Sequence, residues 1–203
     1  EEKVQQNLAN YDKGGEVHYD VASAFIKSMR GSDPNAAVYY LARMIEGGED
    51  IKFIARRMLI LAAEDIGLAN PNALLMATTA FQAVQAVGLP EARIILSQAA
   101  IYLATSPKSN SAYLAINEAQ ALVRQTGDLP IPLHLRNAPT KLMKELDYGK
   151  EYKYAHDFDG NFVEQEFLPE AVAKTKLFDP QDNSAEAKIR QRLRQQWKEK
   201  YGY

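Results

Sequence analysis

The sequence is punctuated by residues that start and stop helices. Between residues 18 and 127, apolar residues at helical spacing alternate with short segments rich in Gly, Pro, Asp and Asn. Asp33-Pro34 is a start signal, because Asp caps free N–H groups and Pro suits the first helical position. Asp50 is expected to cap the helix that follows. Gly47-Gly48 and Gly67 indicate helix ends, because glycine adopts the left-handed conformation that commonly closes a helix. This region therefore favours several short helices over a sheet.

Six main helices are predicted from these signals. Asn70-Pro71 repeats the cap-and-proline pattern, and Ser106-Pro107 interrupts a later helix. The connections are two to five residues long, which is typical of antiparallel neighbours in a bundle. The predicted helices cover residues 18–30, 34–46, 51–66, 71–87, 90–105 and 110–126.

The character of the chain changes after Gly127. Residues 128–139 contain three prolines and cannot form a regular helix. We expect a short helix over 140–146 and a small β-hairpin pairing 152–156 with 162–167. Ser184 is then expected to cap a terminal helix that reaches about Lys200. The predicted fold class is all-α: a bundle of about six helices with a loop-rich C-terminal extension that contains the hairpin and the terminal helix.

Composition limits the classes of function. The formal net charge is −2, so any nucleic-acid contact must come from a local basic patch. The chain has no cysteine, which fits a cytoplasmic protein. The stretch from Gly67 to Pro90 has no charged residue, but Asn70-Pro71 interrupts it, so we interpret it as a buried helix and expect no membrane association. The start lacks an initiator Met, and we expect the chain to be part of a longer protein.

No residue pattern predicts a catalytic, cofactor or metal site. The glycine pairs at 14–15 and 47–48 lack the lysine of a phosphate-binding loop. The three histidines, His18, His134 and His156, are far apart and lack zinc-ligand spacing. The adjacent acids Glu64 and Asp65 point about 100° apart on a helix, so we expect one to pair with Arg56, Arg57 or a basic residue of another helix.

Two surfaces are candidates for contacts with partners. The helices between Ile51 and Thr105 carry apolar residues on more than one face, which predicts a subunit interface. The terminal helix carries a basic stripe, which fits a DNA backbone as well as an ordinary solvated surface. Its apolar stripe, Ile189, Leu193 and Trp197, would dock on the domain. The predicted interface residues are Leu74, Leu75, Phe81, Ile94 and Ile95, and the predicted DNA contacts are Arg190, Arg194 and Lys198.

Several separated motifs resemble one known family. They include HYDVASAFIKSMRGSDPNAAVYYLARMI, ARRMLILAAEDIGLANP and LPIPLHLRNAPTKLMKELDYGKEYKYAHD, in this order. The segment from about residue 18 to 193 is similar in sequence to the C-terminal region of the replication-associated recombination proteins. These are AAA+ ATPases called RarA or MgsA, related to the Werner-helicase-interacting proteins.

The resemblance implies a role and a domain plan. Residues 1–17 look like the end of an upstream ATPase lid, residues 18–127 like a helical oligomerisation domain, and residues 128–203 like an extension packed on it. The family implies a DNA-stimulated ATPase of stalled forks, with ATP and Mg²⁺ bound upstream of this region. It also implies homotetramers and a partnership with single-stranded-DNA-binding protein, at the replication fork and nucleoid.

We therefore expect a non-catalytic oligomerisation domain of a recombination ATPase. The alternative is a DNA-binding module that uses the basic C-terminal segments, and an independent enzyme is the weakest hypothesis. The oligomeric state and the salt dependence of DNA binding discriminate between the first two.

Overall fold

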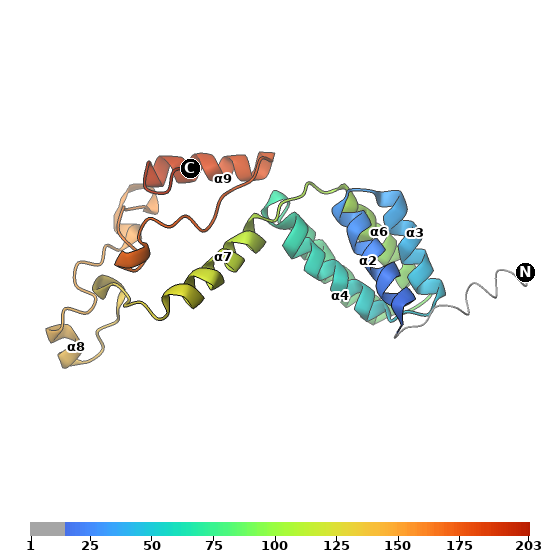
Figure 1. Ribbon diagram of the computed structural model, residues 1–203, viewed down its shortest axis with the longest axis horizontal. Helices are drawn as coiled ribbons and strands as arrows, with labels where there is room; N and C mark the ends of the chain where they lie inside the picture. Colours follow the sequence, from blue (N-terminus) through green and yellow to red (C-terminus); the bar gives the residue numbers. More distant parts are fainter. Residues whose placement is uncertain (1–14) are drawn as a thin grey trace, which may run out of the picture. The chain divides into compact units, whose positions relative to one another are not determined.

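The computed structural model describes residues 15–203 (Figure 1). The predicted lid segment therefore lies mostly outside the described residues. The described chain forms two compact units. Unit 1 contains the residues up to Tyr113 together with Gln181–Glu186, and unit 2 contains Leu114–Pro180 with Ala187–Tyr203.

Residues 15–203 are all-α, as predicted, and contain no strand. The main helices of unit 1 are packed against one another, with α2, α3, α4 and α6 side by side (Figure 1). Their bounds lie within a few residues of the predicted ones. The helices are α2 (Glu16–Arg30), α3 (Pro34–Glu46), α4 (Ile51–Leu61), α5 (Asn72–Val87), α6 (Ala92–Thr105), α7 (Ser111–Thr126), α8 (Lys141–Glu145) and α9 (Ser184–Trp197).

Two of the helix starts follow the predicted capping. The Asp33 carboxylate accepts hydrogen bonds from the backbone N–H groups of Asn35 and Ala36, both at 3.0 Å. Asp50 accepts one from the N–H of Lys52 at 2.9 Å. These side chains satisfy donors that an uncapped first turn leaves free.

Other helix ends differ from the prediction. The helix expected over 51–66 ends at Leu61 and continues as a π-helical turn, η1 (Ala62–Ile66), followed by a 3₁₀ turn, η2 (Gly67–Ala69). Gly67 has a φ of 48°, and a Cβ there would lie 3.2 Å from the backbone oxygen of Ser109. Such π-turns are uncommon and are often found at functional sites.

Asn70 and Ser184 do not act as the expected caps. The Asn70 amide donates hydrogen bonds to the Tyr102 hydroxyl at 2.9 Å and to the Ser106 hydroxyl at 3.3 Å, so it joins α6 instead. Asn183 takes the role predicted for Ser184, because its side-chain oxygen accepts from the N–H of Glu186 at 2.9 Å.

The core of unit 1 combines large apolar side chains with many alanines. Phe25, Met29, Met58 and Leu96 are buried and lie on different helices. Alanines occupy much of the inward side of α5 and α6, which lets these helices approach closely. The buried alanines of the two helices are Ala73, Ala77, Ala80, Ala92, Ala99, Ala100 and Ala104.

The predicted β-hairpin in unit 2 is wrong. Residues 152–167 form loops and two 3₁₀ turns, η4 (Ala155–Asp157) and η5 (Asp159–Asn161). The two segments do lie side by side, but the Gln165 side chain joins them. Its amide accepts from the Lys153 N–H at 3.2 Å and donates to the Lys153 carbonyl at 2.7 Å. A side chain thus replaces the backbone partner that a ladder requires.

Unit 2 is held together by an aromatic cluster around Trp197. The ring centroid of Trp197 lies 5.3 Å from that of Phe162 and 5.4 Å from that of Tyr201. Lys200 Nζ lies 4.8 Å from the Trp197 ring and 2.8 Å from Glu166 Oε2. The end of α9 is therefore anchored within unit 2 through aromatic and charged contacts at Trp197, the last residue of the predicted apolar stripe.

Candidate interaction surfaces

Helices α5 and α6 pack against each other and both expose apolar side chains; α5 lies within the charge-free segment 67–90, and α6 follows that segment. Leu74, Leu75 and Ile94 are 44%, 65% and 58% exposed. Ile101, seven residues after Ile94 and on the same side of α6, is also exposed. We call Leu74, Leu75, Ile94 and Ile101 the α5/α6 face.

The other two predicted interface residues are less accessible. Phe81 and Ile95 are half-buried and pack against the core of unit 1. Three of the five residues named from the sequence are therefore free to meet a partner, while two mainly support the helices that carry them.

A second exposed surface lies on α7 and was not singled out from the sequence. Ser111 is the buried residue of this helix, whereas Leu114, Ile116 and Val123 are exposed. The signal was available, because apolar residues recur at helical spacing from Ala112 to Val123.

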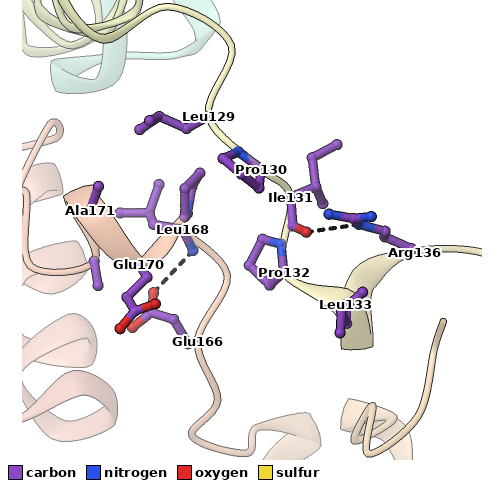
Figure 2. Close-up of a pocket in the computed structure, with 12 residues that line it drawn as sticks. Leu129, Pro130, Ile131, Pro132, Leu133, Arg136, Glu166, Leu168, Glu170 and Ala171 are labelled. Atoms are coloured by element: carbon purple, nitrogen blue, oxygen red, sulfur yellow. Dashed lines mark hydrogen bonds between the residues drawn. The ribbon is translucent and has the colours of Figure 1, made fainter. Parts of the chain in front are cut away.

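Unit 2 contains an apolar groove, which the sequence reasoning also missed. Figure 2 shows residues 129–133 on one wall and residues 166–171 on the other. Its volume of about 910 Å³ falls in the range of ligand pockets. The charged residues among those lining it are Arg136, Glu166 and Glu170.

Two of these charged residues already have partners that shape the groove. Arg136 Nε donates to the Ile131 carbonyl at 2.8 Å (Figure 2). Its guanidinium lies 5.0 Å from the centre of the Tyr148 ring. The Glu166 carboxylate accepts from the Leu168 N–H at 3.0 Å. Burial alone would raise the pKa of Glu166, but hydrogen bonds from Lys200 and the backbone hold it below its usual value.

The basic stripe predicted on the terminal helix is largely occupied by contacts inside unit 2. Arg190 lies 3.1 Å from the Asp179 carboxylate and also donates to the Pro180 carbonyl. Arg194 Nε donates to the Tyr203 carbonyl at 2.7 Å. Lys198 lies beyond the end of α9 and has a φ of 50°. The helix ends at Trp197 rather than near Lys200, so the three cations do not form one helical stripe.

A different pair of cations faces the solvent on α9. Lys188 and Arg192 are exposed and lie four residues apart, so they share one side of the helix. Lys188 and Arg192 are thus available to an anion, whereas Arg190 and Arg194 already make contacts inside unit 2.

The acidic pair at the end of α4 is structural, as expected. Arg30 Nε of α2 lies 2.8 Å from Asp65 Oδ1 in the π-helical turn. The hydrogen bond to Asp65 raises the pKa of Arg30. Asp65 Oδ2 is buried without a hydrogen-bond partner. The turn is also joined to the next segment, because the Ser109 N–H donates to the Asp65 carbonyl at 2.8 Å.

The histidines have separate surroundings. Nδ1 of His18 contacts the buried carboxylate of Glu49, and Nε2 of His134 lies 2.6 Å from the Glu166 backbone oxygen. Nδ1 of His156 lies 3.2 Å from the Asn161 side-chain oxygen. Within residues 15–203, no three His, Cys, Asp or Glu residues gather as metal ligands, and no helix is long and apolar enough to cross a membrane.

Sequence comparisons identify the family. Residues 31–197 match the profile of the family described as "MgsA AAA+ ATPase C terminal", and residues 1–30 match the one described as "AAA C-terminal domain". The first match covers most of the chain. The chain belongs to the MgsA AAA+ ATPase C-terminal family. The boundary between the matches falls at Gly31, although α2 and α3 on either side of it pack together in unit 1.

Relatives support the same assignment. The chain is 50% identical over 89% of its length to Replication-associated recombination protein A of Bacillus subtilis (strain 168), and 45% identical over 94% to the protein of that name from Coxiella burnetii (strain RSA 493 / Nine Mile phase I). It is 45% identical over 87% to ATPase WRNIP1 of Dictyostelium discoideum. The chain spans 42%, 43% and 20% of these relatives, respectively.

Proposed function

We propose that this chain is the self-association module of an AAA+ ATPase that acts in replication-associated recombination. The observation that carries the proposal is the α5/α6 face. Helix α5, which lies within the charge-free segment from Gly67 to Pro90, exposes Leu75 to water, and the neighbouring helix α6 exposes Ile94. Clusters of exposed apolar side chains often mark protein–protein contact sites.

The proposed partner is a second copy of the chain. A homotetramer with D2 symmetry is the assembly that we favour, because closed two-fold arrangements dominate among soluble homo-oligomers. In the longer protein, this module would hold several ATPase domains at one DNA site. We assign ATP and Mg²⁺ binding to a part of the longer protein that precedes this chain. We place the protein at replication forks in the cytoplasm.

Size-exclusion chromatography with light scattering on the 203-residue chain tests the proposal. We expect an even-numbered assembly at tens of micromolar, and a purely monomeric mass would contradict it. Leu75→Glu should reduce the mass, because a charge would be buried at the contact.

The alternative function is DNA binding through α9. The exposed pair Lys188 and Arg192 favours it, since cations four residues apart can contact neighbouring phosphates. Any such binding would be electrostatic and insensitive to base sequence. DNA contacts remain a prediction for Arg190, Arg194 and Lys198. A contact of this chain with single-stranded-DNA-binding protein also remains a prediction.

A further inference from the structure

Helix α7 carries an apolar stripe that is accessible along its length. The members of the stripe lie three and four residues before and after Ala119, with Ala112 one further step of three residues away, and therefore share one side of the helix. All are exposed or half-buried, and Ile116 and Val123 are 56% and 58% exposed. Glu118 and Arg124 lie outside the stripe. The α7 stripe consists of Ala112, Ala115, Ile116, Ala119, Leu122 and Val123.

Such a helix needs a packing partner. Its 16 residues correspond to a length of about 24 Å. Isolated helices of this length are marginal in water, and most helical stability in proteins comes from packing of the apolar side. In α7 that side is exposed at Ala112, Ile116 and Val123 and half-buried at Ala115, Ala119 and Leu122, so much of its apolar surface remains accessible.

We propose that α7 pairs in antiparallel orientation with α7 of a second copy, about a two-fold axis at Ala119. This inference rests on the proposed self-association and names a contact distinct from the α5/α6 face. In such a pair, Ala119 meets its own copy, Ile116 lies opposite Leu122, and Ala115 lies opposite Val123. The small side chain of Ala115 thus faces Val123, and the two larger side chains, Ile116 and Leu122, face each other. The stripe is therefore complementary to a second copy of itself, as a two-fold contact requires.

The stripe favours a second copy over a charged partner, because it contains no charged residue and offers nothing for an ion pair. A single pair of 24 Å helices is nevertheless small beside the roughly 1,200–2,000 Å² of a stable interface. The α7 pair is therefore expected to act together with the α5/α6 face. Two different two-fold contacts are what a D2 tetramer needs, and loss of the α7 pair should leave dimers.

Cysteine cross-linking tests the geometry directly, because the chain has no cysteine of its own. Ala119→Cys should form a covalent dimer under mild oxidation, since two-fold symmetry brings the two copies of residue 119 together. A mixture of Ala115→Cys and Val123→Cys chains should give the mixed dimer in preference to either self-dimer. Ala121→Cys is the matched control, because Ala121 is exposed on the opposite side of α7.

A second measurement uses charge. Ile116→Glu with Val123→Glu should convert tetramers to dimers by light scattering, with the helical circular dichroism retained because both positions are exposed. The α7 pairing alone would be overturned if Ala121→Cys cross-linked as readily as Ala119→Cys. It would also be overturned if the parent chain associates and the double glutamate variant has the same mass. A monomeric parent chain whose Ala119→Cys variant does not cross-link would overturn both proposals. A chain that cross-links at residue 119 but is indifferent to Leu75→Glu would support α7 and reject the α5/α6 face.

Discussion

The hydroxyl of Ser111 donates a hydrogen bond to the carboxylate of Glu186, which lies 75 positions later in the chain. Glu186 is fully buried and lies in the first turn of α9, whereas Ser111 begins α7. Asn183 also donates to this carboxylate. One buried acid therefore lies at the start of two helices, where free N–H groups and the helix dipoles favour a negative charge. This contact holds residues 181–186 within unit 1.

Glu186→Gln should destabilise unit 1. We expect a loss of about 1–3 kcal/mol in the free energy of unfolding, because a charge-assisted acceptor is replaced by an amide whose N–H₂ lacks a partner. Urea denaturation at pH 7 measures it. Glu199→Gln, an exposed residue beyond the end of α9, is the control and should change stability by less than about 0.5 kcal/mol.

The same carboxylate predicts a dependence on pH. Burial alone would raise the pKa of Glu186, but hydrogen bonds from Ser109, Ser111 and Asn183 lower it below the usual value. The stabilisation is then complete above the unfolded pKa of about 4.3 and is lost as the pH falls through the lower folded pKa. Between pH 7 and pH 3, the parent chain should lose more stability than Glu186→Gln. Equal losses would show that this group does not control the acid transition.

Arg30→Met should also lower stability. It removes the partner of Asp65, whose side chain is 11% exposed, and leaves a carboxylate poorly compensated inside the protein. Because the Arg30 side chain is itself 46% exposed, we expect a loss of about 1–2 kcal/mol rather than the larger cost of a fully buried pair. Lys27→Met, an exposed change on the same helix, serves as the control in thermal unfolding.

Leu75→Glu and Ile94→Glu should weaken self-association without unfolding the chain. Both side chains are more than half exposed, so the monomer tolerates the charge, whereas an apolar contact does not. Sedimentation velocity over a concentration series gives the dissociation constant, which we expect to rise at least tenfold. Tyr39→Glu on α3, at 58% exposure, is a matched change on another surface. If it weakens association equally, the α5/α6 face is not the contact.

Lys188→Glu with Arg192→Glu should weaken DNA binding and keep the fold. At most two phosphate contacts are removed, so the slope of log affinity against log salt should fall by up to about 2. Fluorescence anisotropy with a single-stranded oligonucleotide measures it. Lys52→Glu with Arg56→Glu on α4 is the control, because these exposed cations have the same four-residue spacing. Arg190→Glu is a poor probe, since it would also break the contact with Asp179.

The start and end signals in the sequence were sufficient to predict most helices. Asp33, Asp50, Gly48 and Gly88 act locally, because a cap or a left-handed residue needs only its own turn. The family resemblance rests on contiguous motifs and was likewise accessible from the sequence. The apolar residues on more than one face of the helices between Ile51 and Thr105 also predicted an interface surface that includes Leu75.

Only the tertiary structure decided what depends on distant residues. Asn70 joins α6 rather than capping α5, and Gln165 bonds to the Lys153 backbone in place of a strand. Arg190 is held by Asp179, so cations that look equivalent in the sequence differ in their availability. Glu186 is buried although most glutamates face solvent, because three partners from two segments satisfy it. Local signals determine where helices begin and end, whereas the environment of a polar side chain depends on which segments the fold brings together.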